Sequence, residues 1–404
     1  MTEHIVIVGA GQAGGWAAKT LRGEGFAGRI TLIGLEPHPP YERPPLSKGV
    51  LAGAATVESC YLFKPDAFAA LNLDFRAGVR ATRIDRAARA VHLEDGSSVA
   101  YDRLILATGG EARRLPVPGG DGPRVHYLRT LDESLAIRAA LGPGRRLAVA
   151  GGGWIGLEVA ATARKSGAEV TVLEALDRVC ARAVPPSVSE FLRGLHERNG
   201  VSIRTSCGVK AIEDRGAGGL RLTLGDGSTL DADAVVVGIG LVPQIQLARE
   251  AGLDVGDGVV VDERCRTSDP NILVAGDCAN MPLACLGRRV RLESWANAQN
   301  QAIAAAKSAL GQDAPYDELP WFWSDQFDAN VQLLGLPERW PDPIVRGDRN
   351  GASFSLFYLD GERIAAVVSV NAPRDLRAAK RLMQVGRTVC ATDLVDPAIN
   401  LAKL

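Results

Sequence analysis

The chain has 404 residues, a formal net charge of −1 and 46% hydrophobic residues, so it is long enough for two or three domains with sizeable cores. A charge so close to zero argues against a general nucleic-acid binder or a protein that works on a charged membrane surface. The sequence contains no apolar stretch long enough to cross a bilayer, and Met1 to His4 lead straight into a predicted strand without a signal-like segment. We therefore expect a cytoplasmic protein with neither a membrane nor a nucleic acid as partner.

The cysteines and histidines give no sign of a metal centre. Seven cysteines are scattered without CxxC or CxxxxC spacing, and five histidines lack ligand spacing. The odd cysteine count and the scatter argue against a disulfide framework, an iron–sulfur cluster, a zinc site or a redox-active dithiol. We expect all seven cysteines to be small buried hydrophobic residues.

The first strong signal is a glycine-rich loop near the N-terminus. The apolar run Ile5 to Val8 predicts a strand, and Gly9-Ala10-Gly11-Gln12-Ala13-Gly14 opens the helix that follows. In such a loop the first glycine permits the turn, the second lets the backbone approach a pyrophosphate, and the third lets helix and strand pack closely. A second strand over Ile30 to Ile33 leads to Glu36, about 20 residues beyond the loop, where a carboxylate accepts hydrogen bonds from a ribose.

The same pattern returns later in the chain. A strand over Leu147 to Ala150 precedes Gly151-Gly152-Gly153-Trp154-Ile155-Gly156, and the strand over Val170 to Leu173 ends at Glu174. An acid there binds the ribose hydroxyls of NAD and repels the 2′-phosphate of NADP, so we predict NADH over NADPH, with the nearby Arg178 weakening that preference. Glu158 falls in the first turns of the predicted helix, where it either faces the nicotinamide or stabilises the helix dipole.

Two complete units of this kind indicate one chain that holds two dinucleotides and passes electrons between a nicotinamide and a flavin. The strand Leu104 to Ala107 ends at Thr108-Gly109, and the later strand Ala234 to Val237 ends at Gly238-Ile239-Gly240, as an internal duplication would. Asn271 to Asp277 then predict a strand that returns to the first unit, and a helix is expected over 295–310.

We predict an α/β fold with two doubly wound dinucleotide-binding (Rossmann-like) domains and a C-terminal α+β interface domain. The FAD-binding domain is discontinuous, over 1–112 and 241–316, and the NADH-binding domain covers 113–240, after the turn-rich boundary Pro116 to Gly120. The third domain covers 317–404, because alternating runs such as Ser353 to Leu359 and Ile364 to Val370 predict antiparallel strands.

Two further segments carry charged candidates. A carboxylate at the strand end Gly276-Asp277 either binds the ribityl chain of FAD or caps a helix, and the first glycine loop favours the flavin role. The proline-rich loop Tyr41 to Lys48 carries Arg43 and Lys48, which either lie beside a flavin and stabilise its reduced form or are solvated surface charges.

These segments together resemble a known family. Tyr41 to Lys48, the two glycine loops, Ala107-Thr108-Gly109, Val274 to Asp277 and Trp321-Phe322-Trp323-Ser324-Asp325-Gln326 are similar to the FAD-dependent ferredoxin reductase components of bacterial ring-hydroxylating dioxygenases. The resemblance is to the glutathione-reductase-like branch, which includes putidaredoxin and rubredoxin reductases, and it covers essentially the whole chain.

The resemblance implies roles for individual residues. Lys48 is expected near flavin N5, paired with Glu158, which reorients when NADH enters. Arg43 is expected on the FAD phosphates and Asp277 on the ribityl chain.

It also implies roles for two tryptophans and shows two departures. Trp295 is expected near the outer edge of the flavin, and Trp323 beside the isoalloxazine at the ferredoxin dock. The family often has an acid where this chain has Leu35, which leaves Glu36 as the sole ribose acceptor. Trp154 stands where the family commonly has a small aliphatic residue.

The expected cycle runs from NADH to FAD and then, one electron at a time, to a [2Fe–2S] ferredoxin of Rieske or putidaredoxin type, which in turn feeds the oxygenase. A reductase for a P450-type ferredoxin or a rubredoxin, an NADH oxidase, and an NADH-sensing interaction module remain alternatives. A predicted helix of the third domain gathers basic residues that either steer an acidic ferredoxin or form an ordinary solvated face: Arg374, Arg377, Lys380, Arg381 and Arg387.

Overall fold

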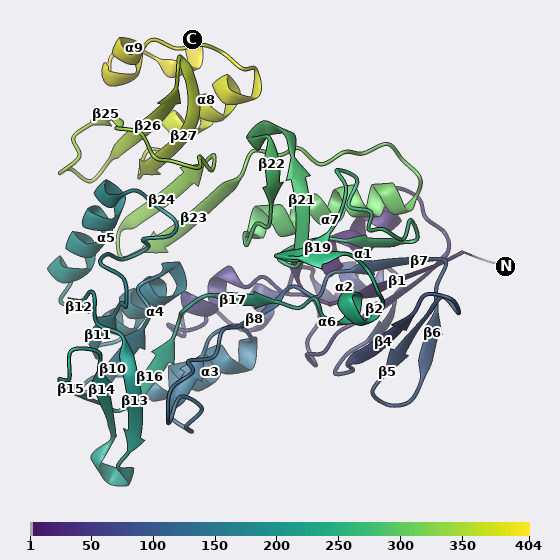
Figure 1. The fold of residues 1–404 in the computed structure, drawn as a ribbon, viewed down its shortest axis with the longest axis horizontal. Coiled ribbons are helices and arrows are strands. Elements are labelled where there is room, and N and C mark those ends of the chain that lie inside the picture. The colour runs from purple at the N-terminus through teal and green to yellow at the C-terminus, as the bar shows by residue number, and fades with distance from the viewer. Residues whose placement is uncertain (1–2) are drawn as a thin grey trace.

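The computed structural model describes residues 3–404, and Figure 1 shows three groups of strands and helices. The first is built on a five-stranded parallel sheet in the order β20-β7-β1-β2-β3. The bounds of its strands are β1 (His4–Val8), β2 (Arg29–Ile33), β3 (Asp74–Arg76), β7 (Arg103–Leu106) and β20 (Ile272–Val274). Because β20 pairs with β7, a late segment of the chain completes the sheet that the first residues begin.

Helices α1 (Gln12–Gly23) and α7 (Trp295–Ala309) pack against each other beside this sheet. The strands are apolar on both faces because a parallel sheet is covered on both sides. Short helices and two smaller sheets complete the region: α2 (Pro65–Ala69), α6 (Gln246–Glu250), β4 (Ala81–Asp85), β5 (Ala90–Leu93), β6 (Ser98–Ala100), β18 (Val255–Gly256), β19 (Gly258–Val260), β21 (Ala279–Leu283) and β22 (Arg288–Val290).

The second group repeats the architecture of the first. Its five-stranded parallel sheet has the order β12-β11-β10-β16-β9. Its strands and helices are β9 (Val125–Tyr127), β10 (Arg146–Ala150), β11 (Glu169–Leu173), β12 (Ser202–Arg204), β16 (Ala234–Val237), α3 (Leu131–Ala140), α4 (Trp154–Lys165) and α5 (Pro186–Arg198).

Two antiparallel sheets accompany this second group. One is formed by β13 (Val209–Asp214), β14 (Leu220–Leu224) and β15 (Thr229–Ala232). The other pairs β8 (Gly110–Ala112) with β17 (Leu241–Pro243), where the chain enters and leaves the group. The two crossings therefore run side by side.

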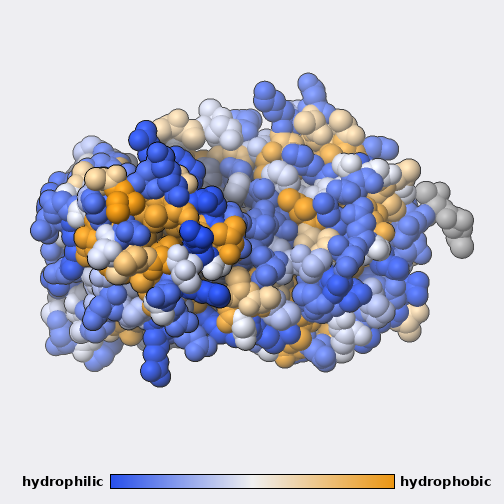
Figure 2. All heavy atoms as spheres, turned by 90° about the horizontal axis from the view of Figure 1, so that it is seen from above, coloured by the Kyte–Doolittle hydropathy of each residue, from blue (hydrophilic) through white to orange (hydrophobic). Residues whose placement is uncertain are grey.

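The third group is a five-stranded antiparallel sheet in the order β23-β24-β27-β26-β25, with helices at the C-terminal end. Its elements are β23 (Trp321–Gln326), β24 (Ala329–Leu334), β25 (Ile344–Gly347), β26 (Phe354–Asp360), β27 (Arg363–Val370), α8 (Pro373–Gln384) and α9 (Ala391–Val395). Figure 2 shows the molecule from above. Apolar residues gather over this third group, and a hollow lies between it and the rest of the molecule.

The fold class is as predicted: two doubly wound units and an α+β C-terminal unit. The predicted basic helix is shorter than the charge pattern suggested, because α8 ends at Gln384 and Gly386 adopts a φ of +62°. Arg387 therefore lies beyond the helix, and its assignment to the helix was wrong. The proline-rich loop contains one short 3₁₀ helix, Pro44–Ser47, since proline is compatible with a first helical turn.

The burial predicted for the cysteines is only partly correct. Five are buried, but Cys285 and Cys390 are exposed. Cys285 lies in a short 3₁₀ helix of the first group, and Cys390 precedes α9 at the surface. Within residues 3–404, no helix has the length and apolar character that crossing a membrane would need.

Candidate functional site

Three glycines of the first loop occupy positions with different physical requirements. Gly9 has a φ of +112°, and a Cβ there would lie 2.1 Å from the Ala107 carbonyl oxygen. A Cβ on Gly14 would lie 1.8 Å from the carbonyl oxygen of Gly9. A Cβ on Gly11 would find its nearest atom, Arg43 Nη2, at 3.9 Å, so it would make only an ordinary van der Waals contact. The turn and the helix packing fix the first and third glycines, whereas the second leaves room for a ligand.

The second loop repeats this geometry. Gly151 has a φ of +108°, and a Cβ there would lie 2.4 Å from the carbonyl oxygen of Gly238. A Cβ on Gly156 would lie 2.0 Å from the Gly151 oxygen, whereas at Gly153 the nearest atom is 3.8 Å away. The two loops are therefore equivalent ligand cradles, each at the carboxyl end of a parallel strand and the N-terminus of a helix.

Both cradles open into one cavity of about 1750 Å³. Ligand pockets usually measure ~300–1000 Å³, so this volume suits two dinucleotides. The cavity is lined by nearly all of the predicted site residues: Gly9, Gly11, Gln12, Ala13, Glu36, Arg43, Lys48, Thr108, Gly109, Gly151, Gly153, Trp154, Ile155, Glu158, Glu174, Gly240, Asp277, Trp295 and Trp323. Gly14 and Gly156 lie behind this lining, in the helix–strand contacts described above.

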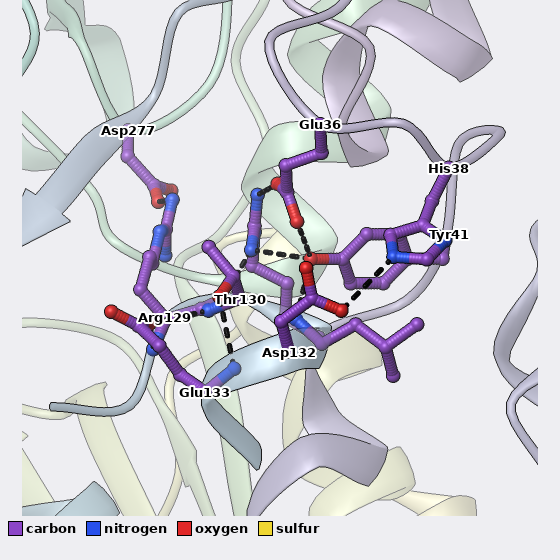
Figure 3. Close-up of polar contacts among 10 residues, drawn as sticks. Glu36, His38, Tyr41, Arg129, Thr130, Asp132, Glu133 and Asp277 are labelled. Atoms are coloured by element: carbon purple, nitrogen blue, oxygen red, sulfur yellow. Dashed lines mark hydrogen bonds and ion pairs between the residues drawn. The ribbon is translucent and has the colours of Figure 1, made fainter. Parts of the chain in front are cut away.

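Glu36 is held by side chains of the proline-rich loop (Figure 3). Tyr41 donates its hydroxyl to Glu36 Oε2 at 2.5 Å, and Arg43 Nη2 lies 3.0 Å from Glu36 Oε1. The Leu131 amide donates to the Tyr41 oxygen at 3.1 Å. Burial raises the pKa of Tyr41, so its phenol stays protonated and remains a donor. The predicted ribose acceptor and the predicted phosphate contact thus lie in direct contact.

Asp277 has a partner that the sequence did not indicate. Arg129 Nη2 donates to Asp277 Oδ2 at 2.9 Å, and the Arg129 carbonyl accepts from Arg43 Nη1 (Figure 3). Arg129 directly precedes a capping box in which Thr130 and Glu133 cap α3. The Thr-x-x-Glu motif was the signal available in the sequence, because it predicts that a helix starts directly after Arg129.

Two polar groups in this wall lack partners within residues 3–404. Both amide atoms of Gln12, which is 8% exposed, and Nε of Arg129 are buried without a hydrogen bond. Buried polar groups are nearly always satisfied, so these atoms call for a ligand with acceptors and donors. FAD, with its pyrophosphate and hydroxyls, fits this wall and the room left at Gly11.

Glu158 is 3% exposed and is surrounded by donors from other parts of the chain. Lys48 Nζ lies 2.6 Å from Oε2, and the Ser47 hydroxyl donates to the same oxygen at 2.5 Å. The Ser324 hydroxyl, from β23, donates to Oε1 at 2.6 Å. The sequence left two roles open for Glu158. The geometry disfavours simple helix-dipole stabilisation, because the carboxylate is paired with the ammonium of Lys48. The pairing with Lys48 implied by the resemblance is present.

Glu174 and Arg178 differ in their freedom to meet a nucleotide. Glu174 Oε2 accepts the Gly152 amide at 2.7 Å, and Oε1 accepts the Leu176 amide at 2.8 Å, at the rim of the cavity. Arg178 donates to the Val184 and Ala181 carbonyls and to the Ser189 hydroxyl within 2.8 Å. Its guanidinium is committed to these acceptors, which argues against the expected weakening of NADH preference.

Aromatic side chains of β23 meet those of other elements at the wall of the cavity, and Trp295, Trp321 and Trp323 form a tryptophan cluster. Trp323 stacks on Trp321 with ring centroids 5.1 Å apart, and Trp295 meets Trp323 edge-on at 5.7 Å. Trp154, the unexpected residue of the second loop, packs against Phe322 at 5.1 Å. The large ring at position 154 therefore joins the second cradle to β23.

Thr108, Gly109 and Gly240 lie where the chain passes between the two doubly wound units. Thr108 donates its hydroxyl to the Gln244 carbonyl at 2.7 Å, and Gly109 and Gly240 have φ values of +62° and +112°. Cys180 also lines the cavity, but burial, followed by the charge of Glu174, raises the pKa of its thiol. A thiol kept protonated in this way is a poor redox nucleophile.

Two cradles in one cavity, with a buried carboxylate on its wall paired to a partly exposed lysine, define an oxidoreductase that binds two dinucleotides. Comparison with known proteins agrees. Residues 3–302 match the pyridine nucleotide-disulphide oxidoreductase family, and residues 321–404 match the reductase C-terminal family. The chain belongs to the pyridine nucleotide-disulphide oxidoreductases, and its cofactors are FAD and NADH.

The similar proteins share the whole length of the chain. Rhodocoxin reductase of Rhodococcus erythropolis is 45% identical over 98% of this chain and 93% of that protein. The ferredoxin–NAD(+) reductase component of the anthranilate 1,2-dioxygenase system of Burkholderia cepacia is 42% identical, covering 99% of this chain and 98% of that protein. The structure of the reductase in a covalent putidaredoxin reductase–putidaredoxin complex matches with a TM-score of 0.95 and 42% identity, covering 99% and 97% of the two chains.

Proposed function

We propose that this protein passes electrons from NADH through FAD to a [2Fe–2S] ferredoxin that feeds an aromatic-ring-hydroxylating dioxygenase. The observation that carries the proposal is the single cavity that joins two dinucleotide cradles to the tryptophan cluster of β23. A relative of similar length is named as the reductase component of the anthranilate 1,2-dioxygenase system, which supports the choice of partner.

Different parts of the chain bind the two cofactors and the ferredoxin. Residues 1–112 and 241–316 bind FAD, residues 113–240 bind NADH, and residues 317–404 form the reductase interface domain. The pairing of β20 with β7 and of β8 with β17 supports this division, because both place residues after the second unit back beside the first.

FAD is assigned to the first cradle. Gly9, Gly11, Gln12, Ala13 and Gly14 hold its pyrophosphate at the N-terminus of α1. Glu36 accepts from the ribose, and four further residues line the rest of the cofactor site: Arg43, Thr108, Gly109 and Asp277. FAD, when bound, supplies the conversion of two-electron to one-electron transfer.

NADH is assigned to the second cradle. Gly151, Gly153, Trp154, Ile155 and Gly156 hold its pyrophosphate. Glu174 selects it against NADPH through the ribose, with Gly240 at the crossing between the units. Lys48 and Glu158 face the reacting rings, and Glu158 turns away from Lys48 when NADH enters.

The C-terminal interface domain provides the route by which electrons leave for the ferredoxin. Trp323, with Trp295, shields the cavity and lies on the path towards a docked ferredoxin. The exposed arginines of α8, Arg374 and Arg377, give the same domain a positive face that attracts an acidic partner. We place the protein in the cytoplasm, because NADH is available there and all seven cysteines are free thiols.

A second candidate is a reductase for a putidaredoxin-like ferredoxin of a monooxygenase. Rhodocoxin reductase and putidaredoxin reductase are both at least as similar to this chain as the dioxygenase component is. A choice between the two partners therefore rests on measurement.

The deciding experiment is cytochrome c reduction by NADH under anaerobic conditions, with no ferredoxin, with a Rieske-type ferredoxin or with a putidaredoxin-type ferredoxin. Strong dependence on the Rieske type supports the primary proposal, and dependence on the putidaredoxin type supports the second. Rapid flavin reduction without dependence on either ferredoxin contradicts both and points to a rubredoxin, to oxygen or to a sensing role.

A further inference from the structure

A chain of buried side chains runs from Glu158 through the interface domain to α5. Ser324 Oγ donates to Glu158 Oε1 at 2.6 Å, Gln326 Nε2 donates to Ser324 Oγ at 3.0 Å, and His196 Nε2 lies 2.8 Å from Gln326 Oε1. His196, Gln326 and Ser324 are all at most 1% exposed. These side chains therefore form a buried, continuous path that joins the candidate hydride site to α5.

All hydrogen bonds of this series of side chains run in the same direction, from His196 towards Glu158. The Gln326 amide oxygen only accepts, so His196 carries its proton on Nε2. The Gln326 amide nitrogen then donates to Ser324, whose single hydroxyl hydrogen is free to donate to Glu158. Burial lowers the pKa of His196, which keeps the ring neutral in this tautomer. Every donor is thus aimed at the carboxylate.

Strand β23 presents different side chains on its two faces. Successive side chains of a strand point to opposite faces. Ser324 and Gln326 lie on the face that meets α4, whereas Trp321 and Trp323 lie on the other and form the tryptophan cluster. One strand of the interface domain therefore contacts both the Glu158 carboxylate and the candidate exit path for electrons.

We propose that Ser324, Gln326 and His196 are positioning residues that set the orientation of the Glu158 carboxylate beside Lys48 before NADH enters. This inference rests on the proposed function, because it assigns the hydride site a part of the interface domain. A carboxylate buried to this degree needs several donors, and removing one leaves it imperfectly solvated. Glu158 then loses its fixed orientation, and so does Lys48.

The test is anaerobic rapid mixing of the FAD-loaded protein with NADH, which gives the limiting rate of flavin reduction and the NADH dissociation constant separately. In Ser324→Ala the limiting rate should fall about tenfold to a hundredfold, as expected for one hydrogen bond to a charged group, with a smaller change in the dissociation constant. Ser324→Thr keeps the hydroxyl and should restore most of the rate. Gln326→Met should have a smaller effect in the same direction, because it acts through Ser324.

The matched control is Ser369→Ala. Ser369 lies in β27 of the same sheet, is 1% exposed, and its hydroxyl has no partner within residues 3–404. Its removal should leave the limiting rate within about twofold of the wild type. If Ser324→Ala loses FAD or fails to fold, Gln326→Met and Ser324→Thr decide between the outcomes.

Different failures have different meanings. A wild-type protein that NADH does not reduce contradicts the proposed function. A normal wild type with unchanged limiting rates in Ser324→Ala and Gln326→Met contradicts the positioning role alone.

A second readout does not depend on turnover. In protein labelled with ¹⁵N-histidine, His196 should show a neutral ring protonated at Nε2, assigned by its loss in His196→Gln. Its Nε2 resonance should shift in Ser324→Ala and not in Ser369→Ala. A ring protonated at Nδ1 overturns the direction of the chain.

Discussion

The two dinucleotide units have nearly identical cradles but different coverings. In the first, Glu36 is fixed by the side chains of Tyr41 and Arg43, which lie in the loop that directly follows it. In the second, Glu174 is fixed by backbone amides of its own unit. Ile155 of the second loop is 45% exposed, whereas Ala13, at the corresponding position of the first, is 6% exposed.

This difference teaches how one fold serves a resident and an exchangeable ligand. The first cradle is bordered by Arg129 and Asp277, which come from distant segments and pair at 2.9 Å. In the second cradle Ile155 is exposed and Glu174 is held by backbone amides of its own unit, although Trp154 packs against β23. The covering of each loop, rather than the loop itself, distinguishes the two sites.

The largest expected effect concerns the third glycine of each loop. Gly14→Ala places a Cβ 1.8 Å from the Gly9 oxygen, so helix α1 must shift and the purified protein should lose most of its FAD, at a cost on the order of 3 kcal/mol. Gly156→Ala makes the same clash in the second unit, and there FAD content should survive while NADH binding weakens. Flavin absorbance per protein and NADH titration measure the two effects.

Gly11→Ala is the control for these variants. Its Cβ would meet no atom closer than 3.9 Å, so the FAD-free protein should melt at the wild-type temperature while FAD binding weakens. Equal losses of both ligands in Gly14→Ala and Gly156→Ala would show that the two units are not independent sites.

A smaller effect is expected from the wall of the first site. Arg129→Met leaves the Asp277 carboxylate without its partner at 2.9 Å, and the FAD dissociation constant should rise about tenfold to a hundredfold. Arg86→Met, which breaks the more exposed pair with Asp269, should leave FAD binding unchanged. Equilibrium dialysis of FAD against both variants decides whether the Arg129 pair belongs to the cofactor site.

These contrasts also show what the sequence alone could predict. The two loops, the acids Glu36 and Glu174 and the strands between them follow local rules of spacing, and the structure places them at one cavity. Arg129 and Ser324 could not be assigned their partners in this way, because Asp277 and Glu158 lie far away along the chain and only the tertiary fold brings them together. The resemblance supplied the pairing of Lys48 with Glu158, which spacing alone did not.

The errors have a similar physical origin. Cys285 and Cys390 were expected to be buried on the basis of residue type, but short surface turns expose them. Arg387 was placed on a helix because of its charge, although a glycine in the left-handed region ends the helix before it. Average residue preferences were overridden by local backbone geometry in both cases.

The third prediction uses the matched acids of the two units. Glu174→Ala removes the charge that repels a 2′-phosphate, so the preference for NADH over NADPH should shrink about tenfold while FAD content stays normal. Glu36→Ala should lower FAD content and leave the nucleotide preference unchanged. Steady-state kinetics with both nucleotides measure the ratio, and an unchanged preference in Glu174→Ala would remove Glu174 from the NADH site.

The smallest expected effect is on the pH dependence of stability, and it again concerns a buried network. Burial lowers the pKa values of His4, His126 and His196 in the folded protein. As the pH falls below the ordinary histidine value of about 6.5, the unfolded chain takes up protons that the folded chain does not, so stability decreases until the folded values are reached. Each histidine contributes at most ~1.4 kcal/mol per pH unit to this slope.

His196→Gln should therefore flatten the decline of the melting temperature between pH 7 and pH 5, measured with excess FAD. Ser369→Ala, which changes a buried residue that does not titrate, provides the control and should leave the slope as it is in the wild type. Because His196 belongs to the chain that ends at Glu158, a flattened slope also means that the neutral ring is the form the folded protein requires. An unchanged slope in His196→Gln would instead mean that His196 takes up a proton as readily when folded as when unfolded, which a donor chain aimed at Glu158 does not allow.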